Sequence, residues 1–468
     1  MGVGAGSFRR GLGALALVVV VGVLQWGFLT ADTSPALAQT ASRPNIVLIV
    51  TDDQRFDTLH VMPKVRRQLV ARGMTFRRAI VTNPLCCPSR ATILTGRFSH
   101  TTGVYRNAAP NGGWRAFQPS ESDTIATALQ VAGYRTALIG KYLNGYLGDE
   151  VYVPPGWDRW FAFMTAPRYF NYSMYDDRLG RVTHTWTPKD YSTDVIRNKA
   201  VSFIRNTAAG TPLFLVVTPF GPHGSFIPAP RHKGDFSTAR VPLGPAVNEA
   251  DVSDKPSYIR RQGIGDPSAV RTRTRKQWET LLAVDDLVGQ ISTALRDTGR
   301  SGNTLVIFTS DNGLSNREHR WGQKFVPYEH SIRVPLIMRL PGEIPGGSIS
   351  RTLASNVDLA PTIADFAGVS LSADGVSLRP VLTGGAPSVR GSVLLEHVEG
   401  VEGVPTYCGV RARSFMFVHY ATGEEELYDL VHDPHQLRNV VASRQSKAAD
   451  MRNLTKSLCQ PVPPGFSW

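Results

Sequence analysis

Residues 45–54, Asn-Ile-Val-Leu-Ile-Val-Thr-Asp-Asp-Gln, join an unbroken apolar run to two adjacent carboxylates. The run over 45–50 is dominated by Ile, Val and Leu, which is typical of a strand buried on both faces of a parallel sheet. Asp52 and Asp53 come directly after that predicted strand. Ligand sites in such sheets lie beyond the carboxyl ends of the strands, so both carboxylates are candidate site residues.

The rest of the chain alternates between apolar runs and amphipathic segments. Further strands are predicted at 135–139, 213–217, 304–309 and 333–339, and helices at 62–73, 123–131, 194–206, 276–296 and 356–368. This alternation predicts an α/β fold with a large, mostly parallel sheet flanked by helices. Residues 225–272 are rich in Pro, Gly and charge, and we expect them to form a long irregular loop over the site.

The C-terminal residues follow a different pattern. Strands are predicted near 392–397 and 414–420, and they precede the segment 425–430 and a helix over 441–458. We therefore expect a large domain over 43–384, which carries the candidate site residues, and a smaller α+β domain over 389–468, joined by a Gly- and Pro-rich linker.

Four predicted strands end on polar residues. Asp52-Asp53 follow the first strand, and Lys141, His223 and Asp311-Asn312 follow three others. Carboxylate and amide oxygens are ligands of hard divalent cations. Asp52, Asp53, Asp311 and Asn312 could hold one Ca²⁺ or Mg²⁺, although Asp-Asp and Asp-Asn-Gly are also common in turns and helix caps.

The composition restricts the class of partner. The chain has 468 residues and a formal net charge of +13, with 42% hydrophobic and 19% charged residues. These proportions are globular, and the excess of basic residues favours acidic ligands. No compact run of Lys and Arg interleaved with aromatic residues is present, so we expect acidic small molecules or sulfated glycans rather than nucleic acid.

Residues 1–38 have the pattern of an export signal. Arg9 and Arg10 precede an apolar stretch over 12–29, and Ala36-Leu37-Ala38 offers a cleavage site. The alternative is an N-terminal membrane anchor, because the apolar stretch approaches the length of a bilayer span. We expect cleavage, no stable membrane insertion afterwards, and a secreted, periplasmic or cell-surface protein. The arginine pair also permits a twin-arginine export route.

A vicinal cysteine pair opens the predicted helix within 84–97, Pro-Leu-Cys-Cys-Pro-Ser-Arg-Ala-Thr-Ile-Leu-Thr-Gly-Arg. Pro88 would fix the first helical φ, and Arg90 would add a forked donor to a helix terminus that attracts anions. By itself such a pair is more often two buried thiols. However, Cys86 to Arg90, continuing to Leu94-Thr95-Gly96, resembles the Cys-x-Pro-Ser-Arg-x-x-x-Leu-Thr-Gly motif of the type I sulfatases.

The resemblance, which extends from about residue 43 to about 440, implies an alkaline-phosphatase-like fold. It implies that a separate formylglycine-generating enzyme oxidises Cys86 to Cα-formylglycine. One hydroxyl of the aldehyde hydrate would attack the sulfur of a sulfate ester, and deprotonation of the other would release inorganic sulfate. It also implies that Asp52, Asp53, Asp311 and Asn312 bind the metal together with the modified Cys86.

The resemblance assigns roles to four further side chains. Arg90 would hold the formylglycine and the metal ligands in place, and Lys141 and Lys324 would grip the sulfate oxygens. His223 would lie near the leaving-group oxygen. The alternatives are that either lysine is a solvated surface charge and that His223 is a hydrogen-bonded loop residue.

One position departs from the family pattern. Many sulfatases have a histidine two residues after the first lysine, where this chain has Leu143 followed by Asn144. The Gly-Lys-Tyr-Leu-Asn form and the Cys-Cys pair resemble the N-acetylglucosamine-6-sulfatase and endosulfatase branch. Asn144 could form hydrogen bonds there but could not act as an acid or base. His319 is a second candidate near the leaving group, the alternative being a surface histidine.

These observations predict an exported sulfatase that acts on a sulfated sugar or an aryl sulfate, with 6-O-sulfated glucosamine of glycans as the expected substrate. The alternatives are a phosphomonoester or phosphodiester hydrolase of the same superfamily and a non-catalytic binder of sulfated glycans. If Cys86 is converted and Cys87 packs behind it, Cys408 and Cys459 are left as a candidate disulfide pair. Exo or endo action, oligomeric state and the choice between Ca²⁺ and Mg²⁺ stay open.

Overall fold

The computed structural model describes residues 1–6, 43–146, 152–164 and 166–468. Most of the expected export signal therefore lies outside the described residues. Residues Arg43–Trp468 form one compact unit, and the domain boundary expected between 384 and 389 stays a prediction. Among the described residues, no helix combines the length and apolar character that crossing a membrane requires.

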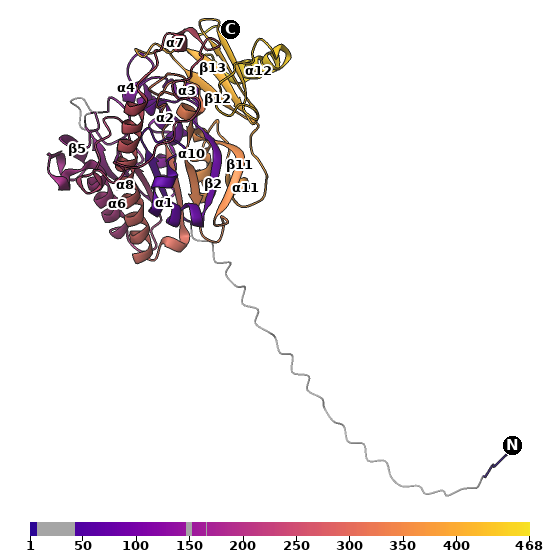
Figure 1. Ribbon diagram of the computed structural model, residues 1–468. Helices are drawn as coiled ribbons and strands as arrows, with labels where there is room; N and C mark the ends of the chain where they lie inside the picture. Colours follow the sequence, from indigo (N-terminus) through magenta and orange to yellow (C-terminus); the bar gives the residue numbers. More distant parts are fainter. Residues whose placement is uncertain (7–42, 147–151, 165) are drawn as a thin grey trace. The chain divides into compact units, whose positions relative to one another are not determined.

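A mixed sheet of eleven strands forms the centre of this unit (Figure 1). Its strand order is β11 (Ser348–Ser355), β2 (Met74–Ile80), β10 (Leu336–Arg339), β8 (Thr304–Ser310), β1 (Asn45–Thr51), β7 (Leu213–Thr218), β3 (Arg135–Gly140), β4 (Arg159–Phe163), β5 (Tyr172–Asp176) and β6 (Gly180–His184), and β9 (Arg333–Val334) pairs with β2. Strands β8, β1, β7, β3 and β4 are parallel, while β10, β5 and β6 pair antiparallel. The predicted α/β fold is confirmed.

Alternate residues of β1 pack on opposite faces of this sheet. Ile46, Leu48 and Val50 belong to a core with α2 (Cys86–Thr95), α5 (Ile125–Val131) and α10 (Leu359–Ala367). Val47 and Ile49 pack with α1 (Pro63–Gln68), α6 (Ser192–Arg205) and α8 (Pro267–Asp297). Because both faces of the strand are covered by helices, the apolar run at 45–50 has no polar alternation.

Shorter helices and 3₁₀ turns occur between the strands and the long helices. They are α3 (Ser99–Thr102), α4 (Gly113–Phe117), α7 (Ser257–Arg260), α9 (Glu329–Ile332) and α11 (Arg379–Leu382), with 3₁₀ turns η1 (Leu59–Val61), η2 (Val70–Arg72), η3 (Gln118–Ser120), η4 (Pro188–Asp190), η5 (Pro230–His232), η6 (Ser301–Asn303) and η7 (Asn356–Asp358). Of the irregular loop expected over 225–272, the part 225–256 is mostly without regular structure, whereas α7 and the start of α8 occupy much of the remainder.

A second, antiparallel sheet follows near the C-terminus. It consists of β12 (Ser392–His397), β13 (Tyr407–Ala412), β14 (Phe415–Tyr420) and β15 (Glu425–Asp429), and α12 (Gln445–Leu458) packs on it through Ala448 and Met451. A disulfide joins Cys408 in β13 to Cys459, directly after α12. The candidate pairing of these two cysteines is confirmed.

Several boundaries differ from the sequence prediction. The helix expected at 276–296 begins at Pro267, because the Asp266 carboxylate caps it by accepting hydrogen bonds from the backbone N–H groups of Ser268 (2.8 Å) and Ala269 (3.2 Å). The strand expected at 333–339 is broken between β9 and β10 at Pro335, which has no N–H to donate. Strands β2, β4, β5, β6, β11 and β13 were not predicted.

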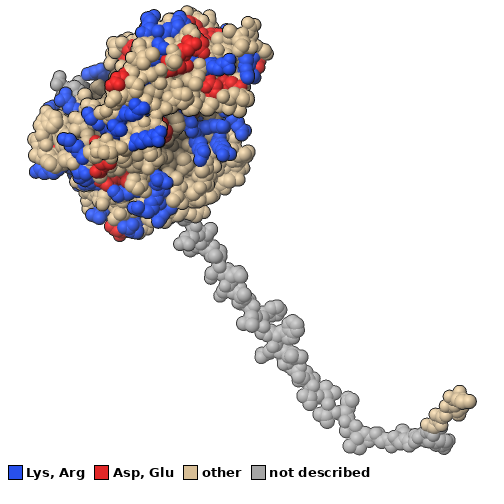
Figure 2. Space-filling model, in the orientation of Figure 1, with Lys and Arg blue, Asp and Glu red and all other residues tan. Residues whose placement is uncertain are grey.

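Basic side chains are spread over the face of the molecule drawn in Figure 2. On the face drawn in Figure 2, lysine and arginine side chains occur over both sheets, with acidic side chains between them. On that face the basic residues do not form one continuous stripe.

Candidate active site

The first turn of α2 places Cys86 beside the residues that follow β1. Leu85 is extended, the helix begins at Cys86, and the Cys86 side chain is only 1% exposed. The Cys86 Sγ atom lies 3.5 Å from Oδ1 of Asp52. Asp53 has a positive φ of 62°, which turns the chain sharply after the strand. The two segments predicted to carry the chemistry thus meet at one point.

Two buried lysines reach this point from other segments. Lys324 Nζ lies 2.8 Å from Cys86 Sγ and 2.6 Å from Oδ1 of Asp53. Lys141, which follows β3, places its Nζ 2.6 Å from Oδ2 of Asp52. Both lysines are buried, so neither is the solvated surface charge that the sequence left open.

Arg90 connects the helix to the far side of the site. It lies four residues after Cys86 on α2 and therefore on the same face of the helix. Its Nε and Nη2 each lie 2.8 Å from Oδ2 of Asp311, and its Nη1 donates to the backbone oxygen of Lys141 at 2.9 Å. Arg90 thereby fixes the position of Asp311 and of the segment that carries Lys141.

Asp311 and Asn312 follow β8 and contact the residues after β1. Oδ1 of Asp311 accepts hydrogen bonds from the backbone N–H groups of Asp53 (3.2 Å) and Asn312 (2.8 Å). The Asn312 side-chain amide donates to Oδ1 of Asp53 at 2.6 Å. Among the described residues, the buried Oδ1 of Asn312 has no hydrogen-bond partner. A buried acceptor without a donor suits a cation.

The ligand atoms of Asp52, Asp53, Cys86 and His223 all lie within 4.8 Å of one another, which is close enough to surround one metal ion. The sequence predicted Asp311 and Asn312 in this set and did not include His223. Nε2 of His223 lies 3.5 Å from Oδ2 of Asp53. The oxygen donors of Asp52, Asp53, Asp311 and Asn312 fit a hard divalent cation such as Ca²⁺ or Mg²⁺.

The charges of the site shift its pKa values. Burial would raise the pKa of Asp52, but Lys141, His223 and Arg90 outweigh burial and lower it. Burial would likewise lower the pKa of Lys324, and Asp53 reverses that effect. Burial raises the pKa of the Cys86 thiol to about 12, although Lys141 and Lys324 act in the opposite direction. The unmodified thiol is therefore protonated at neutral pH.

His223 and Asn144 both border a cavity of 460 Å³ that also touches Lys141. His223 is 32% exposed, and its Nδ1 lies 2.7 Å from the backbone oxygen of Gly224. The buried Oδ1 of Asn144 has no hydrogen-bond partner among the described residues, whereas Leu143 belongs to the apolar core. Both residues line the cavity, and Asn144 differs from Leu143 in carrying a polar side chain whose oxygen is unpaired.

The structure corrects the alternative proposed for His319. Its side chain is fully buried rather than exposed in a surface loop. Nδ1 of His319 lies 2.6 Å from a carboxylate oxygen of Glu249, and its ring packs 4.2 Å from the ring of Tyr328. These contacts hold the His319 side chain in the packed interior.

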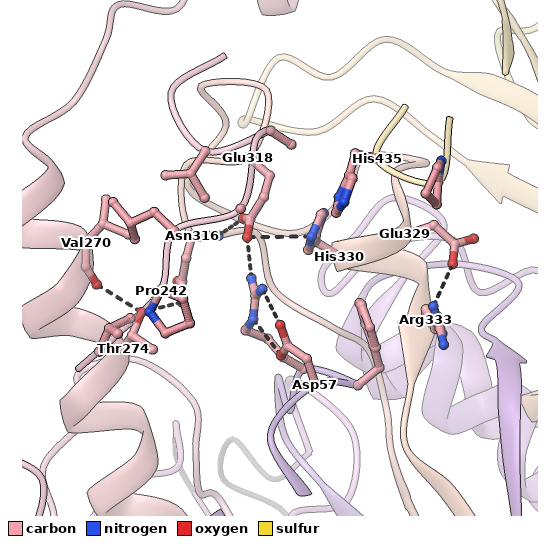
Figure 3. A pocket seen from close by; sticks show the side chains of 18 of the residues that line it. Asp57, Pro242, Val270, Thr274, Asn316, Glu318, Glu329, His330, Arg333 and His435 are labelled. Atoms are coloured by element: carbon pink, nitrogen blue, oxygen red, sulfur yellow. Dashed lines mark hydrogen bonds and ion pairs between the residues drawn. The ribbon is translucent and has the colours of Figure 1, made fainter. Parts of the chain in front are cut away.

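A second cavity of 440 Å³, shown in Figure 3, is lined in part by residues 55–57, which follow Asp53. Arg55 spans one wall, with Nη2 2.8 Å from Asp57 and Nη1 2.8 Å from Glu318. Arg55 was not among the site residues predicted from the sequence, although it lies only two residues after the predicted metal ligand Asp53. Since Arg55 also donates to the backbone oxygen of Leu314 at 3.0 Å, it joins the segments after β1 and β8.

Known proteins resemble this chain over most of its length. The sulfatase family profile matches residues 44–369, and the profile of the C-terminal region of N-sulphoglucosamine sulphohydrolase matches residues 317–461. N-acetylglucosamine-6-sulfatase of Capra hircus is 31% identical over 463 residues, which cover 87% of this chain and 81% of that protein. The enzyme of that name from Homo sapiens is 34% identical over 409 residues, covering 82% and 71% of the two chains.

One solved structure is described as a complex with its substrate D-glucosamine-2-N,6-O-disulfate. It superposes with a TM-score of 0.81 at 26% identity and covers 91% of this chain and 100% of that chain. A phosphonate monoester hydrolase of Agrobacterium radiobacter, 22% identical with a TM-score of 0.71, covers 89% and 95% of the two chains and shares the fold. The chain therefore belongs to the sulfatase family, resembles its N-acetylglucosamine-6-sulfatase members, and is a sulfuric ester hydrolase.

Proposed function

We propose that this chain is an exported sulfatase that removes 6-O-sulfate from glucosamine units of glycans and carries Cα-formylglycine at position 86. Two observations support this substrate. The N-acetylglucosamine-6-sulfatases of Capra hircus and Homo sapiens align with most of this chain and with most of their own length. The similar solved structure is described as a complex with a 6-O-sulfated glucosamine. The observation that carries the modification is the position of Cys86 in the first turn of α2, 2.8 Å from Lys324 and 3.5 Å from Asp52.

A protonated thiol in that position is a poor nucleophile, because only the thiolate attacks efficiently. Conversion replaces the thiol with an aldehyde, whose hydrate supplies a hydroxyl group for attack on sulfur. Sulfate oxygens are negatively charged and repel a nucleophile. The ammonium groups of Lys141 and Lys324 donate hydrogen bonds next to Cys86 and offset that repulsion.

His223 is placed to protonate the leaving alcohol. A carbonyl oxygen only accepts hydrogen bonds, so the 2.7 Å contact with Gly224 keeps the proton of His223 on Nδ1. In this tautomer Nε2 is the atom that faces Asp53. The cationic form of His223 carries a second proton on Nε2 and can donate it to the departing oxygen.

Asp52, Asp53, Asp311 and Asn312, with position 86, would hold the divalent cation. The donor chemistry and the unpaired Oδ1 of Asn312 fit such an ion. A bound ion supplies Lewis-acid stabilisation of the sulfate charge. Arg90 keeps Asp311 in place among these ligands through its two 2.8 Å contacts.

Export is the part of the proposal that rests on sequence alone. Residues 1–38 have a charged start, an apolar stretch and an Ala-Leu-Ala cleavage site. The test is N-terminal sequencing of protein recovered outside the cytoplasm. A chain that begins at Gln39 would support cleavage, and one that retains Met1 and partitions with membranes would support the anchor.

The activity is tested with protein made with and without a formylglycine-generating enzyme. Mass spectrometry of the peptide that contains Cys86 measures conversion, and turnover is measured on N-acetylglucosamine-6-sulfate, an aryl sulfate and a phosphate monoester. We expect turnover in proportion to conversion, with the 6-sulfate preferred. Full sulfatase activity with an unmodified thiol would refute the modification, and a preference for the phosphate ester would refute the substrate class.

A further inference from the structure

A shallow hollow of 550 Å³ lies between the start of α8 and the segment that follows His223. The first turns of α8 form one wall with Arg273 and Lys276, and the segment after His223 forms the other with Ser225 and Phe226. Two cationic side chains and one aromatic ring therefore border the same open space.

Arg273 differs from Arg55 and Arg90, the two arginines that hold the segments after β1 and β8. Each of those two has a carboxylate oxygen at 2.8 Å. In the part of the chain that the structure describes, no carboxylate oxygen lies within 4.0 Å of the Arg273 guanidinium, and its buried Nε has no hydrogen-bond partner. Its one described hydrogen bond runs from Nη1 to the backbone oxygen of Gly322 at 2.9 Å.

The position of this guanidinium is fixed by segments that carry active-site residues. Its Cζ atom lies 5.2 Å from the centre of the Phe226 ring, three residues after His223. Gly322, which accepts its hydrogen bond, precedes Lys324 by two residues. Arg273 thus lies between the segment of the proposed proton donor and the segment of a proposed sulfate-binding lysine.

The environment of Arg273 leaves its charge largely uncompensated. Burial lowers the pKa of Arg273, and Asp53, the carboxylate that acts on it most strongly, offsets burial only in part. An arginine nevertheless stays protonated at any physiological pH. A partly buried cation with free donors is costly unless an anion binds it.

We propose that Arg273, assisted by Lys276, binds a second acidic group of the substrate, a sulfate or carboxylate carried by the sulfated sugar or by the unit linked to it. The proposal rests on the function proposed above. The guanidinium offers a fork of N–H donors that matches the paired oxygens of such groups. Lys276 is exposed three residues further along α8, on the same face. Asp266 also borders the hollow, but both of its oxygens cap the start of α8.

The test compares kcat/KM of fully converted enzyme on three 6-O-sulfated substrates. The first is N-acetylglucosamine-6-sulfate, which has no second acidic group. The second is glucosamine-2-N,6-O-disulfate, and the third is a disaccharide in which a uronic acid is linked to N-acetylglucosamine-6-sulfate. The variants are Arg273→Gln, Arg273→Lys and the control Arg275→Gln. Arg275 lies on the same helix and donates to the backbone oxygen of Ala239 at 2.9 Å, away from the hollow.

We expect Arg273→Gln to lower kcat/KM about tenfold on at least one doubly acidic substrate and by less than about twofold on the singly acidic one. The second and third substrates then distinguish a sulfate from a carboxylate as the bound group. The loss should appear mainly in KM, should shrink at high salt, and should be partly restored in Arg273→Lys. Arg275→Gln should show no such selectivity.

An equal loss on all three substrates would overturn the proposal, because it would show that Arg273 only holds the segments of Phe226 and Gly322 in place. No loss on any of them would overturn it as well. Thermal unfolding of each variant separates damage to the fold from damage to binding. If the unsubstituted enzyme hydrolyses none of the three sulfates, the proposed function itself has failed, and this outcome is distinct from a loss of selectivity.

Discussion

The unconverted Cys86 thiol should be chemically inert, and this can be measured. Its pKa is about 12, against 9.0 for an ordinary cysteine thiol, because burial outweighs the attraction of Lys141 and Lys324. At pH 7.5 a pKa of about 12 leaves about 3 × 10⁻⁵ of the molecules as thiolate, roughly a thousandfold less than for the ordinary thiol. Alkylation requires the thiolate and should be slowed by a similar factor.

The assay is alkylation by iodoacetamide of protein made without a formylglycine-generating enzyme, in the presence of a chelator. Peptide mass spectrometry counts the modified fractions of Cys86 and Cys87 separately, with glutathione as the reference thiol. We expect the Cys86 rate to lie about a thousandfold or more below that of glutathione and to rise about tenfold for each pH unit up to pH 10. The same protein should hydrolyse no sulfate ester above background.

Cys87 provides an internal control. It is also buried, and burial raises its pKa to about 12 as well, but its side chain lacks the close lysine contact of Cys86. If the two cysteines react at the same rate and that rate does not change with pH, then opening of the fold limits the reaction and protonation of the thiol does not. That result, or a Cys86 rate that levels off below pH 9, would refute the reasoning.

Three further results are expected. Lys324→Met removes a donor 2.8 Å from Cys86 and should lower kcat/KM on an aryl sulfate about hundredfold or more; a loss below about threefold would contradict its sulfate-binding role. Replacing Cys408 and Cys459 by Ser opens a covalent loop with a sequence separation of 51, so the free energy of unfolding should fall by up to about 4 kcal/mol. The kcat of the folded enzyme should not change. An unchanged denaturation midpoint would contradict this prediction. Chelation should abolish turnover until Ca²⁺ or Mg²⁺ is restored, and Asn312→Ala should raise the ion concentration needed for half-maximal activity; insensitivity to chelators would exclude the metal assignment.

The residues at the strand ends could be predicted because of a general property of parallel sheets. Strands β1, β3, β7 and β8 are buried on both faces, so their apolar runs are evident in the sequence, and their carboxyl ends meet at one edge. Asp52, Lys141, His223 and Asp311 were placed at that edge without knowledge of the contacts. The missed strands lack this signal: β2 contains Arg77 and Arg78, and β6 is only partly buried.

The position of Lys324 could not be derived in this way, because no predicted strand precedes it. Its segment is held by tertiary contacts: the Trp321 side chain donates to the backbone oxygen of Lys324 at 2.8 Å, and the Phe325 N–H group donates to that of Pro84 at 3.2 Å. The second bond attaches the segment to the turn just before Cys86. Only the family resemblance pointed to Lys324, and Arg273 had no signal at all.

The charges of the site suggest how it accommodates both a metal ion and a sulfate. Three buried carboxylates, Asp52, Asp53 and Asp311, are matched by the three cations Arg90, Lys141 and Lys324. Without an ion this set is close to neutral and attracts an anion weakly. A divalent cation on Asp52 and Asp53 would add two positive charges and would compete with the lysine ammonium groups for those carboxylate oxygens. The lysines would then have free donors where a sulfate needs them, so binding of the ion and binding of the substrate should favour each other.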